Sequence, residues 1–317
     1  MAAQKPIVVV GSINTDLVAV AKRIPAVGET IIGTDFQIHP GGKGANQAVA
    51  VARLGYPVRL IGRLGGDAFG AQLRTYLESA GVDIAGVSTC DGTSGVAVIV
   101  LSSEGENSIV VTPGANAKVT PQDIARNIEI IRGAGSVLAQ LEIPLDTIEY
   151  LATICARENV PLILDPAPAQ KLPAGIFKHV TWFTPNQIEA AFFAGVDLSS
   201  AHGEAPAAMA RAILAKGCNA VLLKLGARGA YLASRSEPGT LVPAFAVNAV
   251  DTTAAGDAFN GGFATGLMLG KSPVESVAFA AAVAGVSVTR AGAQPSMPTM
   301  AEAQELMEDE TAKIAGR

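Results

Sequence analysis

Short runs of apolar residues, each bounded by Gly, Pro or a polar residue, recur along the chain. Such runs are typical of strands that are buried on both faces of a sheet. They comprise residues 6–11, 57–62, 136–141, 161–165, 180–184 and 220–225. Between most of them lie longer segments of helical character, several of which end at Gly, the residue favoured just after a helix. The predicted helices include residues 44–54, 67–80, 204–216, 257–269, 274–288 and 300–317. Strands that alternate with helices predict an α/β fold, a three-layer sandwich around a mainly parallel central sheet.

Two regions interrupt this alternation. Residues 17–38 and 94–112 carry strand-like runs without a helix between them, and in the second region the runs flank Ser-Glu-Gly-Glu, a hairpin signal. Together they predict a small antiparallel β-sheet, formed from about residues 14–40 and 94–113, that projects as a lid. An edge hairpin of the main sheet is the alternative. With no repeat or linker, residues 1–317 are predicted to form a single α/β domain.

Composition narrows the class of protein. Hydrophobic residues make up 49% of the chain, charged residues 16%, and the net charge is −5. Without a basic stripe, nucleic acid is not an expected partner. The three cysteines are far apart, so a disulfide framework or zinc site is not expected, and a reducing cytoplasm fits. No apolar run has the length of a signal peptide or a membrane span, so no membrane partner is expected.

The most informative motif is Val-Asp-Thr-Thr-Ala-Ala-Gly-Asp-Ala-Phe-Asn-Gly, residues 250–261. A helix that begins here presents free backbone N–H groups and a partial positive charge. The small residues Ala254, Ala255 and Gly256 would let a phosphate approach that backbone closely. Asp257 beside it would accept a proton from an incoming hydroxyl. The alternative is that Asp257 is simply a helix N-cap.

A second motif, Gly-Gly-Lys-Gly-Ala-Asn at residues 41–46, opens a predicted helix. Its glycines allow a close backbone approach to a ligand. Lys43 and Asn46 are three residues apart, so they share one face of the first helical turn and suit a polyol. The spacing is not that of a Walker A loop. A flexible turn followed by a capped helix is the alternative.

Asn14 and Asp16 follow the first predicted strand, where ligands bind in open α/β sheets. Alternate residues of an extended chain point the same way, so this pair is suited to gripping two adjacent sugar hydroxyls. The alternative for the pair is an Asx-turn, in which each side chain bonds to its own backbone.

Two further motifs follow later strands. Asn186 and Glu189, in Thr-Pro-Asn-Gln-Ile-Glu, are three apart and suit hydrated Mg²⁺, which prefers oxygen ligands and keeps its waters. A helix start with a favourable first-turn Glu is the alternative. Residues 224–229, Lys-Leu-Gly-Ala-Arg-Gly, form a strand end and a turn that is suited to lining a nucleotide pocket.

In this order, the motifs closely resemble those of the ribokinase (PfkB-type carbohydrate kinase) family. The resemblance covers nearly the whole chain, from residues 11–16 (GSINTD) to residues 289–296 (TRAGAQPS). It implies a ribokinase-like fold and ATP-dependent phosphorylation of D-ribose at the 5-hydroxyl. A related kinase that acts on deoxyribose, another sugar or a nucleoside is one alternative. A non-catalytic sugar sensor on the same fold is another.

The resemblance also implies roles for individual residues. Asp257 matches the family's catalytic base, and Ala254, Ala255 and Gly256 match its anion hole. The matching sugar-binding positions are Asn14, Asp16, Gly42, Lys43, Asn46, Glu142 and Asp257. The matching ATP-binding positions are Asn186, Lys224, Gly226 and Gly229, with Glu189 associated with Mg²⁺.

Family members also resemble one another in a site for a monovalent cation, usually K⁺, next to the anion hole. The matching residues are Asp251 and Ser296 through side chains, and Thr253, Ser287, Arg290 and Gly292 through carbonyl groups. Family members are commonly dimers joined through their lid sheets, which implies a homodimer here.

The chain departs from the family pattern on the nucleotide side. Lys224 replaces a Thr found in some members, and Ala281 stands where a larger polar residue can flank the adenine. Ala97, Ile109 and Val111 occupy lid positions that pack against the apolar face of the sugar in the family.

Overall fold

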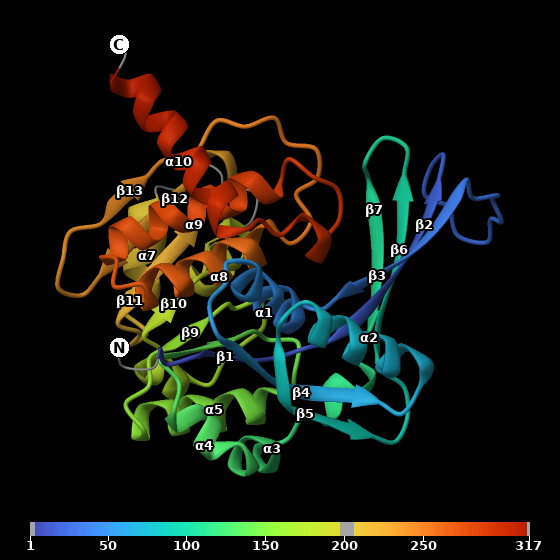
Figure 1. Ribbon diagram of the computed structural model, residues 1–317, viewed down its shortest axis with the longest axis horizontal. Coiled ribbons are helices and arrows are strands. Elements are labelled where there is room, and N and C mark those ends of the chain that lie inside the picture. Colours follow the sequence, from blue (N-terminus) through green and yellow to red (C-terminus); the bar gives the residue numbers. More distant parts are fainter. Residues whose placement is uncertain (1–3, 197–205, 316–317) are drawn as a thin grey trace.

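Figure 1 shows the computed structural model of the protein, which describes residues 4–196 and 206–315. The larger sheet has nine strands in these residues, in the order β13-β12-β11-β10-β9-β8-β1-β4-β5. They are β1 (Ile7–Val10), β4 (Val58–Gly65), β5 (Asp83–Cys90), β8 (Ser136–Ala139), β9 (Leu162–Leu164), β10 (Trp182–Phe183), β11 (Ala220–Lys224), β12 (Ala230–Ser234) and β13 (Thr240–Val242). Neighbours from β5 to β11 are parallel, and β12 and β13 are antiparallel additions at one edge. The predicted mainly parallel sheet is confirmed.

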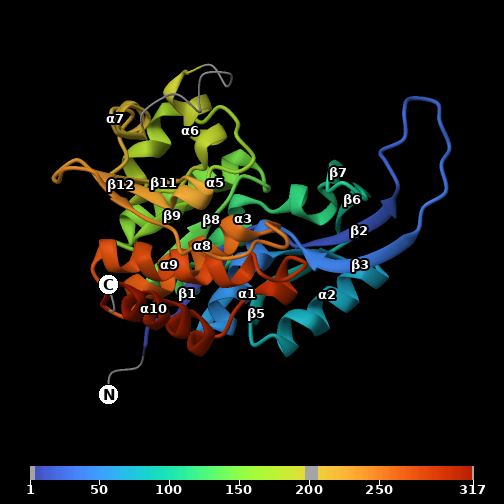
Figure 2. The ribbon, with the colours of Figure 1, turned by 90° about the horizontal axis from the view of Figure 1, so that it is seen from above.

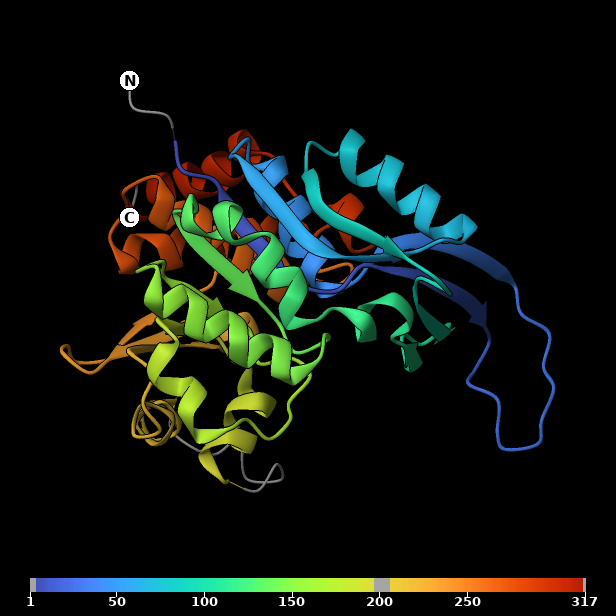
Figure 3. The ribbon, with the colours of Figure 1, turned by 90° about the horizontal axis from the view of Figure 1, so that it is seen from below.

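Two helical layers cover the two faces of this sheet (Figure 3). The helices are α1 (Lys43–Arg53), α2 (Ala68–Ser79), α3 (Pro121–Arg126), α4 (Ile128–Arg132), α5 (Leu145–Arg157), α6 (Gln187–Ala194), α7 (Pro206–Leu214), α8 (Ala255–Met268), α9 (Pro273–Ser287) and α10 (Met300–Ala315). The six predicted helices correspond to α1, α2, α7, α8, α9 and α10, and the outer ends predicted for α7 and α10 lie outside the described residues. No helix in the described ranges is both long enough and apolar enough to cross a bilayer.

The alternation of side chains along β1 explains the sandwich. Ile7 and Val9 pack into one core with residues of α1, α2, α8, α9 and α10. Val8 and Val10 pack into a second core with residues of α3 to α7. All four side chains are fully buried, so β1 needs an uninterrupted apolar sequence.

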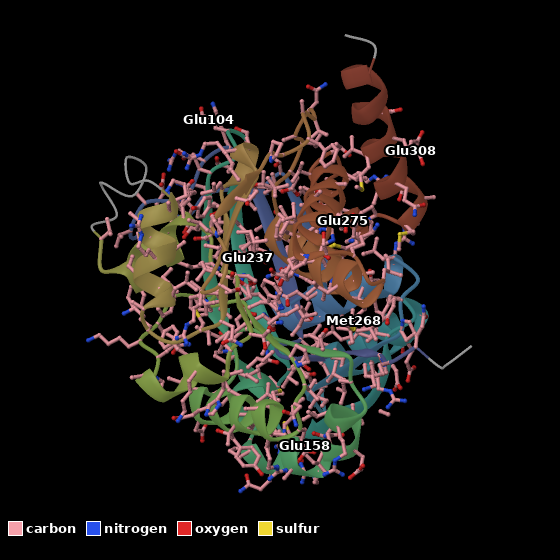
Figure 4. All side chains as sticks on the ribbon, turned by 90° about the vertical axis from the view of Figure 1, so that its left-hand side faces the viewer. Glu104, Glu158, Glu237, Met268, Glu275 and Glu308 are labelled. Atoms are coloured by element: carbon pink, nitrogen blue, oxygen red, sulfur yellow. The ribbon has the colours of Figure 1, made fainter. Side chains whose placement is uncertain are left out.

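A second, separate sheet projects from the main body (Figures 1 and 2). Its four strands run in the order β3-β2-β6-β7. They are β2 (Asn14–Ala21), β3 (Asp35–Gly41), β6 (Gly95–Ser102) and β7 (Asn107–Thr112). The predicted separate small sheet is confirmed, and the alternative of an edge hairpin on the main sheet is wrong. The prediction that it is antiparallel throughout is also wrong: β2–β3 and β6–β7 are antiparallel, but the central pair β2–β6 is parallel, because the two hairpins join side by side in the same direction. Glu104, labelled in Figure 4, lies in the turn between β6 and β7.

The two ends of helix α8 have different surroundings: its C-terminal end packs against the core, and its first turn contacts α1. Met268 (Figure 4) closes the helix on the side where it packs against the core. The first residue, Ala255, lies about 20 Å away along the helix axis, at 1.5 Å per residue. At this end α8 comes close to α1, the helix opened by the Gly-rich motif.

Candidate active site

Asp257 lies in the first turn of α8, and its carboxylate faces α1. Asn46 Nδ2 donates to Asp257 Oδ2 at 3.0 Å, and Gln47 Nε2 donates to Oδ1 at 3.0 Å. The helix N-cap is Ala254, and Asp257 is the third helical residue. The N-cap interpretation of Asp257 is therefore wrong, and its side chain is available for chemistry.

Burial changes the acidity of Asp257. The side chain is 4% exposed, and burial raises its pKa above the ordinary value. The Lys43 ammonium and the two amide donors act in the opposite direction, whereas the charge of Asp165 adds to the rise. A carboxylate with a raised pKa is a stronger base than one in water, as proton abstraction from an alcohol requires.

The Gly-rich motif packs directly against the end of β1. Gly42 is the N-cap of α1 with φ of 90°, and a Cβ there would lie 2.7 Å from the backbone nitrogen of Asn14. Only glycine tolerates both this backbone conformation and this approach. The motif thus packs against the backbone of residues 11–14, the segment that joins β1 to β2. The flexible-turn alternative does not describe this packed position.

Three carboxylates, those of Asp16, Glu142 and Asp257, lie close enough to influence one another, and two of them also act on Lys43. Burial, followed by the charges of Glu142 and Asp257, raises the pKa of Asp16 to about 6. Ser12 Oγ donates to Glu142 Oε2 at 2.5 Å, and the backbone N–H of Lys43 donates to the same oxygen at 3.2 Å. The charge of Asp257, opposed by burial, raises the pKa of Lys43, which stays a cation. This cluster can bind hydroxyl groups through charged acceptors and one ammonium donor.

Asn14 and Asp16 lie on one face of β2, as predicted, and the Asx-turn alternative is wrong because both residues are in the strand. Asn14 Oδ1 accepts from Asn116 Nδ2 at 2.7 Å. This bond fixes the orientation of the Asn14 side-chain amide. Ala97 and Val111 pair across the sheet at the level of Asp16, so they share its face. Ile109 lies on the same face one step further along, where it is 51% exposed.

The residues predicted to form the anion hole lie at the mouth of α8, that is, at its N-terminal end. Ala254 has a left-handed backbone with φ of 58°, uncommon for a residue with a side chain and often found at functional sites. The backbone N–H of Ala258 makes the first helical bond, to Ala254 O at 2.9 Å. The N–H groups of Gly256 and Asp257 precede that bond, where they can face an anion.

The two motifs predicted to bind the nucleotide lie at the ends of β10 and β11. Asn186 and Glu189 form a reciprocal capping box at the start of α6, with bonds of 2.7 to 2.9 Å. The helix-start interpretation is therefore correct as geometry. Each Glu189 oxygen that accepts from Asn186 retains a lone pair, which fits a contact to hydrated Mg²⁺. Burial is the main cause that raises the Glu189 pKa.

Lys224 ends β11, and Gly226 and Gly229 bound the turn that follows it. Its ammonium pairs with Asp165 at 3.0 Å. A Cβ on Gly256 would lie 3.5 Å from Lys224 Nζ, so the ammonium reaches the mouth of α8. Ala281 lies in α9, is 6% exposed and packs into the hydrophobic core that α9 shares with α1 and α8.

The residues predicted for a monovalent cation lie on two adjoining segments. Asp251 Oδ1 accepts from the Thr253 N–H at 2.9 Å, and Oδ2 accepts from the Gly292 N–H at 2.8 Å. The N–H of Arg290 donates to Ser287 O at 3.2 Å. These bonds hold a carboxylate beside a loop rich in carbonyl groups, a donor set that fits a hard cation. The Ser296 hydroxyl donates to Ala293 O at 2.7 Å. No cluster of three or more His, Cys, Asp or Glu in the described ranges has metal-binding geometry.

Sequence reasoning missed several polar residues that hold the site together. They are Ser12, Gln47, Asn116, Gln140, Asp165 and Gln294. Asp165 follows an apolar strand, the same signal that identified Asn14 and Asp16, and could have been found from it. Gln47 directly follows the Gly-rich motif, but nothing in its spacing indicates a contact with Asp257.

Comparison with known proteins places this geometry in a family. The model of the pfkB family carbohydrate kinases matches residues 4–300. The chain is 42% identical over 303 residues to a ribokinase of Bacillus subtilis, covering 95% of this chain and 99% of the relative. It is 39% identical over 306 residues to a ribokinase of Haemophilus influenzae, covering 96% and 99%.

A solved structure has the same fold. The ribokinase of Arabidopsis thaliana, complexed with ribose and ATP, superposes with a TM-score of 0.86 and 36% identity, covering 96% of this chain and 99% of that one. The family match over almost the whole length, on a fold with a buried Asp at the mouth of α8, shows that this chain belongs to the pfkB family of carbohydrate kinases.

Proposed function

We propose that the protein phosphorylates D-ribose at its 5-hydroxyl with ATP, giving ribose 5-phosphate and ADP. One observation carries the proposal: the Asp257 carboxylate is held between the Gly-rich turn of α1 and the positive end of α8. It is thereby within reach of a sugar on one side and a terminal phosphate on the other. The similar ribokinases, one of them complexed with ribose and ATP, support the choice of substrates.

The reaction needs a base, an oriented alcohol and neutralisation of phosphate charge. Asp257 accepts the proton of the 5-hydroxyl while the hydroxyl oxygen of ribose bonds to the γ-phosphorus. The bond between that phosphorus and the β,γ-bridging oxygen breaks, and ADP leaves with this oxygen. The N–H groups of Gly256 and Asp257, next to Ala254 and Ala255, bind the transferring phosphoryl group. Mg²⁺ bound with ATP supplies further positive charge to the phosphates.

The sugar is held by the polar cluster between the two sheets. Asp16 accepts from ribose hydroxyls, supported by Asn14 from the same face of β2 and by Glu142. Lys43 and Asn46 donate from α1, with Gly42 allowing the close approach. The separate sheet acts as a lid, and its apolar residues Ala97, Ile109 and Val111 cover the sugar and exclude water.

ATP lies along the ends of β10 and β11, where Lys224, Gly226 and Gly229 line its path. Asn186 and Glu189 contact the phosphates and the hydration shell of Mg²⁺. K⁺ would be held beside the anion hole, where it would offset negative charge near the phosphates. The residues that would hold it are Asp251 and Ser296 through side chains and Thr253, Ser287, Arg290 and Gly292 through carbonyl groups, and the hydrogen bonds of Asp251 support this choice.

The outer face of the lid suits a homodimer. Phe36, Ile38, Val98 and Val110 lie on the face opposite Asp16 and are 59%, 52%, 45% and 63% exposed. Apolar side chains gathered on one exposed sheet face favour association with a second copy. The cytoplasm, where ATP is abundant, is the proposed location.

An ADP-release assay with a panel of ribose, deoxyribose, fructose and a nucleoside, with and without K⁺, tests the function. Ribose should give the highest kcat/KM. A higher value for another member of the panel would move the activity to that substrate. Ribose binding by calorimetry without ADP release would instead indicate a sugar sensor.

A further inference from the structure

A buried ion pair joins the ends of two strands on the nucleotide side of the site. Lys224 Nζ lies 3.0 Å from Asp165 Oδ1, and the two side chains are 12% and 2% exposed. Asp165 directly follows β9, and Lys224 ends β11, with β10 between them. Burying two charges is favourable only when each is well paired, so neither residue is an incidental surface charge.

The ion pair is placed where a phosphate would arrive. Lys224 Nζ lies 3.5 Å from the point that a Cβ on Gly256 would occupy, at the mouth of α8. Within the described ranges, its only hydrogen bond is the one to Asp165. An ammonium has three donors, so the pairing leaves capacity for phosphate oxygens. A lysine that served only to neutralise Asp165 would have no need of this position.

Asp165 is also connected to the proposed base. Its second oxygen, Oδ2, accepts from Gln47 Nε2 at 3.1 Å, and the same nitrogen donates to Asp257 Oδ1 at 3.0 Å. Gln47 Oε1 accepts from Gln140 Nε2 at 2.7 Å, which fixes the orientation of the Gln47 amide. A continuous series of bonds therefore runs from the Lys224 ammonium through Asp165 and Gln47 to Asp257.

We propose that Asp165 is a positioning residue that holds the Lys224 ammonium at the mouth of α8, where Lys224 binds the terminal phosphate of ATP. This proposal rests on the proposed ribose kinase function and adds a residue and a role to it. Lys224 supplies a fixed positive charge that a neutral side chain at this position would not provide. Through Gln47, Asp165 also keeps the Asp257 carboxylate oriented towards the same phosphate.

The first test removes the ammonium. We expect Lys224→Met to raise the Kd for ATP, measured by calorimetry, roughly 10- to 100-fold, the range for a hydrogen bond to a charged group. Turnover should fall while the Kd for ribose in the absence of nucleotide stays within about two-fold. Lys216→Met, an exposed lysine after α7, is the matched control and should change neither constant. Unchanged ATP affinity in a folded Lys224→Met protein would overturn the proposal.

The second test asks whether Asp165 acts through Lys224. Asp165→Asn should weaken ATP binding in the wild-type background and have little further effect in a Lys224→Met background. Additive effects of the two substitutions on the ATP Kd would show that Asp165 does not position Lys224. Thermal unfolding monitors folding, with exposed Asp83→Asn as the control. If Asp165→Asn fails to fold, Asp165→Glu, which keeps the charge but displaces it, replaces it in the same cycle.

A pH profile adds a readout that a purely structural role would not move. The titratable groups that influence Asp257 are Lys43, Asp165 and Asp16. Because the charge of Asp165 raises the Asp257 pKa, Asp165→Asn should move the acid limb of kcat/KM to lower pH. An unmoved limb would overturn the link to the base. If the wild-type protein did not release ADP with ribose, the proposed function would fail first, and the ATP-binding cycle would still test the ion pair.

Discussion

Asn46 Nδ2 donates to Asp257 Oδ2 across 3.0 Å, a bond that joins residues 211 positions apart in the chain. Gln294 Nε2 in turn donates to Asn46 Oδ1 at 3.0 Å, so the Asn46 amide presents its nitrogen to the carboxylate. The two motifs with the strongest chemical signal thus meet at one carboxylate. The orientation of that carboxylate, and with it the proposed chemistry, depends on this contact.

Replacement of the carboxylate should remove catalysis but keep the sugar site. Asp257→Asn has the same shape and can still accept from one neighbouring amide, but it cannot accept a proton. We expect kcat to fall by roughly 10² to 10⁴, the usual contribution of a general base. The Kd for ribose should change by only a few-fold. ADP release and calorimetry measure the two effects, with Asp83→Asn as the control, and near-normal turnover would remove Asp257 from its role.

Asp16 should make the free protein less stable as the pH rises. Its pKa is raised from 3.8 to about 6, so the folded state holds this proton more tightly than the unfolded chain. The resulting stabilisation is complete below about pH 4 and is lost as the pH rises through about 6. Asp16→Asn should therefore stabilise the free protein at pH 7.5, by on the order of 1 to 3 kcal/mol, although it weakens ribose binding.

Denaturant unfolding at pH 4 and at pH 7.5 checks this expectation. The difference between Asp16→Asn and the wild type should shrink towards the lower pH. Asp35→Asn, at an exposed position on the neighbouring strand β3, is the control. An equal effect of Asp16→Asn at both pH values would mean that the raised pKa does not contribute to stability.

The central fold is largely predictable because burial on both faces of a strand requires a run of apolar residues, which is visible in the local sequence. Strands such as β1 and β8 are buried on both faces and therefore need consecutive apolar residues. Strand β5 lies at the sheet edge, where buried and exposed residues are mixed, and no continuous run marked it. The antiparallel strand β13 is largely exposed and has only three residues, too few for a periodic signal.

The site is less predictable than the fold, for a different reason. Asp257 and the Gly-rich turn could be recognised because a helix mouth and glycines have their own local chemistry. The contacts of Gln47 with Asp165 and Asp257 depend on how α1 packs across the ends of β9 and α8. Contacts between segments far apart in the chain produce no regular residue spacing that a sequence pattern could show, so only the folded structure reveals them.

Gly42 should be the least replaceable glycine at the start of α1. An Ala there meets the backbone of Asn14 and Ser12 within 3.0 Å, and its φ of 90° is strained for any side chain. Gly55 has φ of 72° with nothing within 4 Å of an added Cβ, so Gly55→Ala suffers backbone strain alone. We expect Gly55→Ala to cost about 1 to 2 kcal/mol and Gly42→Ala to cost more and to lose ribose affinity. Equal losses of unfolding free energy would contradict the close approach.

Asp251 should control the response to K⁺. Its carboxylate is the only negatively charged group among the predicted ligands, and its bond from the Gly292 N–H joins it to the loop that carries the predicted carbonyl ligands Arg290 and Gly292. Asp251→Asn keeps the size but removes the charge, so the K⁺ concentration for half-maximal activation should rise roughly tenfold or more. K⁺ titrations of ADP release measure this. Glu237→Gln, at an exposed surface position, should leave the titration unchanged, and a normal K⁺ response in Asp251→Asn would place the cation elsewhere.

The exposed outer face of the lid should mediate dimer formation. Val98 lies in the interior strand β6, 45% exposed, and pairs with Val110 on the neighbouring strand. A lysine at this position would bury a charge in any apolar interface, so Val98→Lys should convert the dimer to a monomer in sedimentation velocity.

The control is Val27→Lys, in the fully exposed loop between β2 and β3, which introduces the same charge away from this face and should leave the dimer intact. If the wild-type protein sediments as a monomer, or if Val98→Lys still dimerises, the interface does not lie on this sheet. Because the inner face of the same sheet is proposed to cover the sugar, loss of the dimer should also raise the KM for ribose more than the KM for ATP.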